Sequence, residues 1–335
     1  MKLAFAGMKL LSDFVQQLKY HAILVLIWLI RFLPYPLMVN FFRFLGIVFF
    51  LVDVFHRKVA TIQIRAALGI ANPWRLVLKV FMNQAVNLVD TIRYVYMSDE
   101  EVKARVVVEG KEHLDEALAS GRGIMAFTGH ISNWEVLLNI TRVLGPEFCI
   151  MADIRNDPKL EAIVNDIRSR YHGVTFLPPK GMLNILINTL KEGKFMGIVI
   201  DMRGEDKNDL FCDIFGMPAP TKSAPAFIAL KGNALIMPVH TLKLNGTYHW
   251  YFGKAIDAAQ FGEGDEAIQK LSDIMQSWVA SVVREHPDQW FWIYSRWLKR
   301  SDMRRVIKKN LDFKEYVHRK AEAVLSDQKK VNSAW

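Results

Sequence analysis

Two apolar runs stand near the start of the chain, at 22–30 and 44–52. The surrounding segment, 20–55, carries few charges, and Pro34 and Pro36 divide it into two helical pieces because proline interrupts a helix. Each run is shorter than the roughly 18 apolar residues of a membrane-spanning helix. Aromatic side chains within the segment favour a membrane interface. We therefore expect a short membrane anchor or a helical hairpin in one leaflet, with two core helices of a soluble domain as the alternative.

Beyond this segment the pattern changes to helices, and then to strands that alternate with helices. Helical patterns cover 57–70, 73–97 and, much later, 265–285. The Asn245-Gly246 dipeptide lies between two strand-like runs and predicts a hairpin. Short runs rich in β-branched and apolar residues predict strands at 105–109, 123–127, 148–152, 174–177, 195–200, 234–244 and 247–253.

Strands that alternate with helices of 10–15 residues favour a layered fold around a parallel sheet. We predict an α/β fold with a mixed, largely parallel central sheet flanked by helices, preceded by an N-terminal hydrophobic helical membrane anchor. The predicted divisions are an anchor at 1–56, a catalytic domain at 57–300 and a basic C-terminal tail at 301–335.

Charge and cysteine content narrow the class of partner. The 335 residues carry a formal net charge of +9, and the stretch 296–335 alone holds twelve Lys/Arg and five Asp/Glu, a net of +7. Such a chain favours anionic partners, namely nucleic acid, an acidic protein or an anionic membrane surface, although a solvated basic tail explains the last stretch equally well. The two cysteines do not form a disulfide scaffold or a metal-ligand spacing. No zinc spacing, helix-turn-helix or RNA-binding strand motif points to nucleic acid.

One histidine is placed where chemistry is expected. His130 directly follows the predicted strand 123–127, and Glu135 lies five residues later, at the start of the next helix. Such a step can return a carboxylate to the imidazole, where it would fix the tautomer and stabilise the imidazolium. The other ring nitrogen would then accept a proton from an alcohol. A structural histidine that caps a helix is the alternative at this point of the argument.

The wider sequence around His130 resembles the late acyltransferases of bacterial lipid A biosynthesis, within the glycerolipid-type acyltransferases that share a His-x4-acidic motif. Gly129-His130 with Trp134-Glu135 matches the first block. Four further blocks follow in the family's order, so the resemblance covers roughly 20–300. These blocks are Arg155-Asn156 with Pro158 and the helix bearing Arg168 and Arg170; Gly193 with 197–202; 215–221; and 287–292 with Arg296-Trp297.

The resemblance implies a set of site residues. His130 and Glu135 would be catalytic, and Arg155, Asn156, Arg168, Arg170, Asp201 and Thr221 would bind substrate, with no metal. Asp201 is expected to orient Arg155 or to cap a turn, and Thr221 to cap a helix beside the site. Trp290, Phe291, Trp292 and Trp297 are expected to pack in the core or against the membrane rather than to line the acyl pocket.

The chain also departs from the family pattern, and the departures concern the substrate pockets more than the catalytic pair. Met202 stands where the family usually has Gln, and Ala224-Pro225 where it has Gly. Asp157-Pro158 follows Arg155-Asn156 in place of an Arg-Pro pair.

The implied reaction transfers a fatty acyl group from a thioester to a lipid hydroxyl, without a cofactor and without a covalent acyl-enzyme. The donor would be acyl carrier protein or coenzyme A, and the acceptor a lipid A precursor, at the cytoplasmic face of the bacterial inner membrane. Acyl carrier protein, the lipid acceptor and the membrane are the expected partners, and nucleic acid is not. Two alternatives remain: an acyltransferase for another acceptor (a phosphatidylinositol mannoside, an ornithine lipid or a lysolipid), or an inactive membrane scaffold of the same fold.

Overall fold

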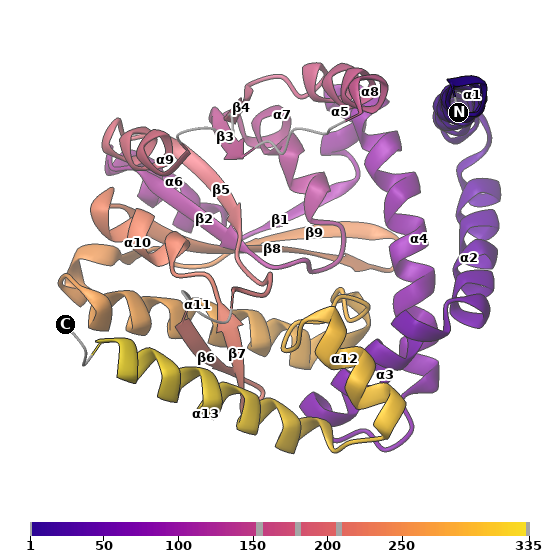
Figure 1. The fold of residues 1–335 in the computed structure, drawn as a ribbon. Coiled ribbons are helices and arrows are strands. Elements are labelled where there is room, and N and C mark those ends of the chain that lie inside the picture. The colour runs from indigo at the N-terminus through magenta and orange to yellow at the C-terminus, as the bar shows by residue number, and fades with distance from the viewer. Residues whose placement is uncertain (1, 152–156, 178–181, 206–209, 333–335) are drawn as a thin grey trace.

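The structure, a computed structural model, describes residues 2–151, 157–177, 182–205 and 210–332, and side chains within these ranges from residue 16 to 328. In this part of the chain an eight-stranded sheet forms the centre of the molecule (Figure 1). The strands of this sheet are β1 (Val106–Glu109), β2 (Ile124–Thr128), β3 (Phe148–Met151), β4 (Val174–Leu177), β5 (Phe195–Val199), β8 (Leu235–Leu244), β9 (Thr247–Phe252) and β10 (Ile256–Asp257).

The sheet is mixed and mostly parallel, which confirms the predicted fold class. Its order is β1-β9-β8-β2-β5-β3-β4, with β10 paired to β8. The four neighbouring pairs from β8 to β4 are parallel, as is the pair β1 and β9, whereas β8 and β9 are antiparallel. The turn between β8 and β9 is the predicted Asn245-Gly246, and both residues have the positive φ that a tight hairpin turn needs (50° and 89°).

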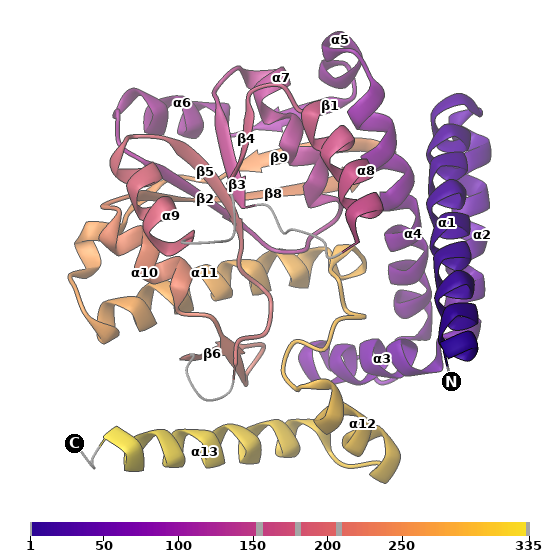
Figure 2. The ribbon, with the colours of Figure 1, turned by 45° about the horizontal axis from the view of Figure 1, so that its top comes forward.

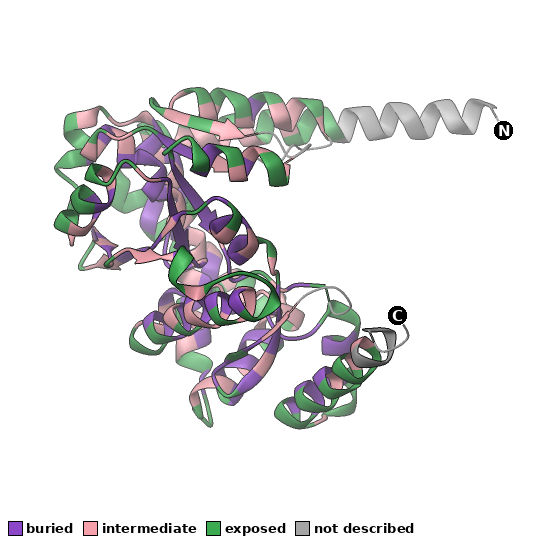
Figure 3. Cartoon of the chain, turned by 90° about the vertical axis from the view of Figure 1, so that its left-hand side faces the viewer, coloured by how far each residue is buried: buried purple, intermediate pink, exposed green. Residues whose placement is uncertain are grey.

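Helices cover both faces of the sheet, because the strand residues alternate between two cores. On β2, Ile124 and Ala126 belong to one core, and Met125 and Phe127 to the other. Figure 3 shows buried residues concentrated in the central strands and exposed residues on the outer helices. The first core also contains residues of α5 (Asp99–Lys103), α6 (Lys111–Ala119) and α7 (Ile140–Leu144), and the second contains residues of α9 (Met182–Lys191), α10 (Ala224–Lys231) and α11 (Asp265–Glu285).

The N-terminal segment forms the predicted helical pair. α1 (Lys2–Phe32) ends just before Pro34, and α2 (Tyr35–Val52) then turns back beside it; both lie against α4 (Trp74–Tyr96) (Figure 2). α3 (Val54–Leu68) connects α2 to α4. Among the described residues, α2 is the one helix long and apolar enough to cross a membrane, and 22% of that window is buried.

Several elements were not predicted from the sequence. They are the hairpin of β6 (Leu210–Ile214) and β7 (Met217–Thr221), together with α10, α12 (Arg300–Lys309) and α13 (Phe313–Asn332). The basic C-terminal stretch is thus largely helical, and α13 packs against β7 and α3. The expected helix after His130 begins as a 3-10 helix, η1 (Trp134–Asn139). The domain boundaries at 56 and 300 stay predictions.

Candidate active site

The site lies where two neighbouring parallel strands end. β2 and β5 pair in register, with Thr128 opposite Val199, so their carboxyl ends lie side by side. His130 follows β2 by two residues, and Asp201 follows β5 by two. In sheets of this kind the carboxyl ends of the strands are where ligands bind, because loops there face a common crevice. The strand order therefore brings together two side chains that are 71 residues apart in sequence.

His130 and Asp201 form a tight hydrogen-bonded pair. Nδ1 of His130 lies 2.6 Å from Oδ1 of Asp201, and the backbone N–H of His130 donates to Oδ2 at 2.8 Å. Gly129 permits this contact, because a Cβ at that position would lie 2.9 Å from the same Oδ2. An ionised carboxylate only accepts hydrogen bonds, so Nδ1 carries the proton and Nε2 has the lone pair. Within the described part of the chain Nε2 has no hydrogen-bond partner.

The electrostatics of the pair favour a charged imidazole. Burial opposes the imidazolium, but the charge and hydrogen bond of Asp201, with a further contribution from the charge of Glu135, raise the pKa of His130 above its usual value. Burial likewise opposes ionisation of Asp201, yet the charge of His130 and the hydrogen bonds from His130 and Trp290 lower the pKa of that carboxyl. The arrangement therefore stabilises a proton on His130 once it has been taken up.

Aromatic residues and a buried arginine complete the surroundings of the pair. Nε1 of Trp290 donates to Oδ2 of Asp201 at 2.6 Å, and the ring of Phe291 stacks on that of His130 with centroids 6.0 Å apart. Gln276 of α11 donates to the carbonyl of Ile200 at 2.8 Å, which fixes the residue that follows β5. Arg296 is fully buried, and although burial lowers its pKa to about 10, the charge of Asp201 acts in the opposite direction.

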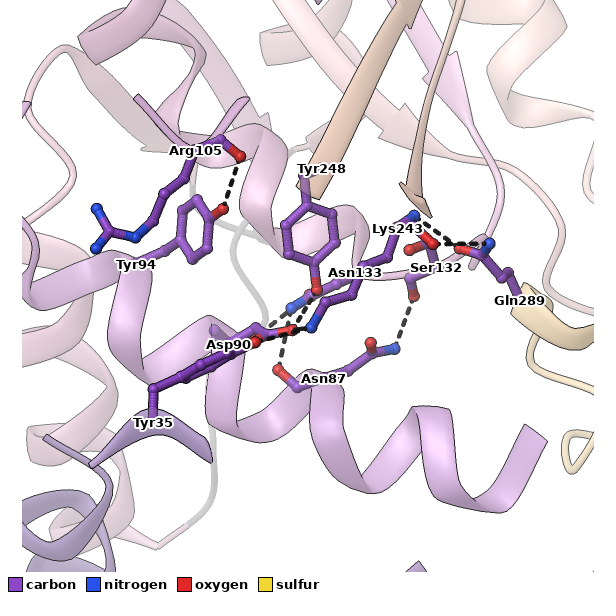
Figure 4. A network of polar contacts seen from close by, with 11 residues as sticks. Tyr35, Asn87, Asp90, Tyr94, Arg105, Ser132, Asn133, Lys243, Tyr248 and Gln289 are labelled. Atoms are coloured by element: carbon purple, nitrogen blue, oxygen red, sulfur yellow. Dashed lines mark hydrogen bonds and ion pairs between the residues drawn. The ribbon is translucent and has the colours of Figure 1, made fainter. Parts of the chain in front are cut away.

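The loop after His130 is held by α4 and by Gln289, which lies in the 3-10 helix η3 (Pro287–Gln289) (Figure 4). Asn87 donates to the carbonyl of Ser132 at 2.8 Å and accepts from the side chain of Asn133 at 3.0 Å. Thr91 donates to Asn133 at 3.1 Å, and the N–H of Ser132 donates to the carbonyl of Gln289 at 2.5 Å. Ser132 has a φ of 52°, an uncommon conformation for a residue with a side chain. These bonds fix the loop that positions His130.

The same helix carries a buried carboxylate one turn further on. Asp90 is 1% exposed and accepts from Tyr35 at 2.8 Å and from Tyr248 at 2.6 Å; it also pairs with Lys243 (Figure 4). Tyr35 begins α2, and Lys243 and Tyr248 belong to β8 and β9. Asp90 thus joins the N-terminal helical pair to the sheet beside the His130 loop.

Three predicted residues have other partners than expected. The sequence predicts that Glu135 binds a ring nitrogen of His130; in the structure Asp201 binds Nδ1, and half-buried Glu135 acts on the pKa of His130 through its charge. Asp201 is therefore not a turn cap, and its predicted contact with Arg155 lies outside the described residues. Thr221 does not cap a helix: it ends β7, is 2% exposed, and accepts from Arg296 at 2.7 Å.

The remaining predicted residues are not brought to His130 by their described contacts. Arg155 and Asn156 lie outside the described residues. Arg168 and Arg170 belong to the end of α8 (Pro158–Ser169), where Arg168 bonds to Glu161 at 3.3 Å and Arg170 bonds to Asp166. In the described ranges no group of three or more His, Cys, Asp or Glu residues is placed to hold a metal ion.

The sequence predicts packing for Trp290 and does not predict the hydrogen bond from its indole to Asp201. Trp292 and Trp297 are fully buried and pack in the core, as predicted. The available signal was the position of Trp290 in a block shared with the resembled family.

Comparisons with known proteins identify the family of this chain. The family model described as bacterial lipid A biosynthesis acyltransferase matches residues 9–299. Phosphatidylinositol mannoside acyltransferases from two Mycobacterium tuberculosis strains, CDC 1551 / Oshkosh and H37Rv, are 24% identical over 196 residues, which are 57% of this chain. The match spans 60% of the length of these relatives.

A solved structure, the 1-acyl-sn-glycerophosphate acyltransferase PlsC from Thermotoga maritima, is 16% identical and covers 76% of this chain and 97% of its own, with a TM-score of 0.35. That score is too low to bear on the fold. The family match instead covers most of the chain, including all five blocks of the resemblance. The chain belongs to the bacterial lipid A biosynthesis acyltransferase family.

Proposed function

We propose that this protein is an O-acyltransferase that moves a fatty acyl group from a thioester to a hydroxyl of a lipid, with a lipid A precursor as the acceptor. The observation that carries the proposal is the His130–Asp201 pair, with Nδ1 bound at 2.6 Å and Nε2 left for the acceptor hydroxyl. Family membership supports the reaction class. The donor is acyl carrier protein, or coenzyme A, and the reaction needs no cofactor.

The proposed reaction is a direct transfer. Nε2 of His130 removes the proton of the acceptor hydroxyl as its oxygen attacks the thioester carbonyl carbon. The C–S bond of the resulting tetrahedral species breaks, and the leaving thiolate takes the proton back from the imidazolium. Thioester and alcohol thus become ester and thiol. A positioned base of this kind contributes typically about 10²–10⁴-fold to the rate.

The supporting residues have distinct tasks in this scheme. Asp201 fixes the Nδ1–H tautomer and stabilises the imidazolium, and Trp290 holds the carboxylate in place. Glu135 adds a second negative charge that favours the imidazolium. Arg155 is the proposed donor to the oxyanion, and Arg168 and Arg170 the proposed contacts to substrate phosphates; these three assignments come from the resemblance alone.

The proposed location is the cytoplasmic face of the bacterial inner membrane. The apolar helices α1 and α2 support membrane attachment, and the net charge of +9 suits both an anionic membrane and an acidic carrier protein. A phosphatidylinositol mannoside is the second candidate acceptor, because the relatives that match 57% of the chain carry that substrate in their names.

The test is acyl transfer in detergent, followed by mass spectrometry. Acyl carrier protein and coenzyme A thioesters are offered with a lipid A precursor, a phosphatidylinositol mannoside or a lysolipid, using wild type and His130→Ala. The proposal expects an acylated lipid A precursor with wild type and none with the variant. Transfer only to another acceptor would replace the acceptor assignment, and equal transfer by folded His130→Ala would refute His130 as the base.

A further inference from the structure

A cavity of about 700 Å³ lies between α2, α4 and the segment 291–300. One wall is apolar and is built from both helices; it consists of Phe42, Leu45, Phe49, Phe81, Ala85 and Leu88. The remaining lining includes three cationic side chains, Arg203, Lys299 and Arg300. A cavity with these two parts suits an amphiphile whose chain meets the helices and whose head is negatively charged.

The cavity reaches the catalytic pair through two residues. Phe291 lines it and also stacks on the ring of His130 at 6.0 Å. Arg203 lines it as well and stands two residues after Asp201, with its backbone N–H donating to the hydroxyl of Tyr294 at 3.1 Å. The lining therefore includes a residue in direct contact with the base that the proposed reaction requires.

The charge of the lining favours an anion. Asp53 is the carboxylate in this lining; it is bound to His56, with Oδ2 and Nδ1 2.7 Å apart, and it also interacts with the charge of Arg300. Lys299 and Arg300 are exposed at the start of α12, and the guanidinium of Arg300 lies 5.2 Å from the ring centroid of Phe55. Arginine and lysine are the side chains that recognise phosphate, arginine with a two-pronged donor geometry.

A second cavity, of about 750 Å³, lies on the other side of α4 and differs in character. Its lining includes the amides of Asn83, Asn87, Asn245 and Gln289. Of its three cations, Arg43, Lys79 and Lys243, the last two are paired with Asp288 and Asp90. It lacks the row of aromatic and aliphatic side chains that a fatty chain needs. Of these two cavities of the described residues, the first is therefore the one suited to a lipid with a fatty chain.

We propose that the 700 Å³ cavity binds the acceptor as a lipid with a phosphate-bearing head group. Its phosphate contacts Lys299, Arg300 and Arg203, and a chain lies along α2 and α4. The route of entry is lateral, because the outer side of α2 exposes Phe41 and Phe44, so that the helix that forms the apolar wall also faces the membrane. This inference rests on the proposed function only in naming the bound lipid as the acceptor; the binding site itself does not depend on that function.

The test measures binding in the absence of chemistry. His130→Ala protein in an uncharged detergent is titrated with lysophosphatidic acid and with the monoacylglycerol of the same chain. Lysophosphatidic acid is expected to bind about 10–100-fold more tightly, the range of one or two hydrogen bonds to a charged group. Lys299→Gln/Arg300→Gln should abolish that difference, whereas Lys308→Gln/Lys309→Gln, at the exposed end of the same helix, should keep it.

A second variant tests the apolar wall. Leu88 is 45% exposed, so Leu88→Glu should leave folding intact while it places a carboxylate in the path of the chain, and both ligands should then bind at least about tenfold more weakly. Equal affinity for the two ligands, or an unchanged difference in Lys299→Gln/Arg300→Gln, would overturn the inference. Because His130→Ala cannot react, phosphate-selective binding without any transfer by wild type would refute the proposed function and leave this site standing.

Discussion

The side chains around Asp201 show how a buried carboxylate can stay charged. Asp201 is 3% exposed, yet it accepts from Nδ1 and the backbone N–H of His130 and from Nε1 of Trp290. Three donors and the neighbouring imidazole offset the cost of taking a carboxylate out of water. The charge in turn makes His130 a stronger base than a free histidine.

Replacement of this carboxylate should change the pH dependence. Activity requires neutral His130, so kcat/KM of wild type should fall as pH drops through the raised pKa of His130. Asp201→Asn removes the largest of the contributions that raise this pKa, so the acid limb should move to lower pH as the plateau falls. A smaller shift in the same direction is expected for Glu135→Gln, whose charge is the weakest of these contributions. An acid limb that stays in place in Asp201→Asn would argue against the pairing.

At this scale the sequence predicted the base but not its partner. His130 was found because a histidine at the end of a strand, in a recognisable block, is a local signal. Its partner is 71 residues away, and the contact depends on β2 and β5 being neighbours, which strand order alone decides. Glu135 is only five residues from His130 in sequence, and for that reason the sequence predicts it, and not Asp201, as the carboxylate that binds Nδ1.

Among the elements, α4 joins the N-terminal helices α1 and α2 to the loop after His130. One side of it packs against α1 and α2, and another side bonds to Ser132 and Asn133 through Asn87 and Thr91. Ser132 holds a positive φ, a conformation that costs energy for a non-glycine residue and persists only when its surroundings enforce it.

Loss of the Asn87 side chain should therefore loosen the loop. In Asn87→Ala we expect kcat to fall about 10–100-fold with a smaller change in KM. The reason is that a displaced His130 slows proton transfer more than it weakens substrate binding. Stability should fall by only about 1–2 kcal/mol, the cost of unmet hydrogen bonds. Arg75→Ala, on the exposed first turn of α4, is the matched control. Steady-state kinetics and thermal unfolding together measure both effects, and an unchanged kcat in Asn87→Ala would show that the loop does not need this contact.

Helices were predicted correctly where the apolar repeat extends over several turns, and short elements without such a repeat were missed. The helices at 57–70 and 73–97 appear as α3 and α4, because each repeats its apolar residues over several turns. The β6–β7 hairpin was missed because Pro218 and Pro220 within β7 argue against a strand. η1 could not be distinguished from an α-helix, since both turns follow similar residue preferences.

At the scale of the whole molecule, the apolar surface is concentrated on the N-terminal helices. Trp28, Phe32 and Phe44 are each more than half exposed, which is uncommon for large aromatic residues in water. Together with the hydropathy of α2, this surface supports attachment to a membrane through α1 and α2.

Removal of these aromatic residues should weaken membrane binding without unfolding the protein. For Trp28→Ser/Phe32→Ser/Phe44→Ser we expect about 100-fold weaker partition into phospholipid vesicles, at roughly 1 kcal/mol for each side chain. Thermal stability should change little because the three side chains are exposed. Vesicle co-sedimentation measures the partition, with Leu183→Ser, an exposed leucine on α9, as the control. Equal sedimentation of the triple variant and wild type would place the membrane contact elsewhere.

The general architecture was accessible from the sequence because alternating strands and helices leave few ways to build a layered sheet. The packing of the C-terminal stretch was not, since its charge suggested a tail. Its apolar residues are few but well spaced: Phe313, Tyr316, Val317 and Ala321 are all buried beneath a charged outer side. Whether such a helix docks depends on a partner surface, here β7 and α3, that only the fold provides.

The rate of the chemical step is the most direct test of whether His130, held by Asp201, performs the transfer. Single-turnover acyl transfer would be followed by rapid quench and mass spectrometry for wild type, His130→Ala, Asp201→Asn and the control Asp115→Asn, an exposed carboxylate on α6. We expect His130→Ala and Asp201→Asn each to slow this step by about 10²–10⁴-fold. Asp115→Asn should match wild type. A wild-type rate in folded Asp201→Asn or His130→Ala would refute the proposed role of the pair.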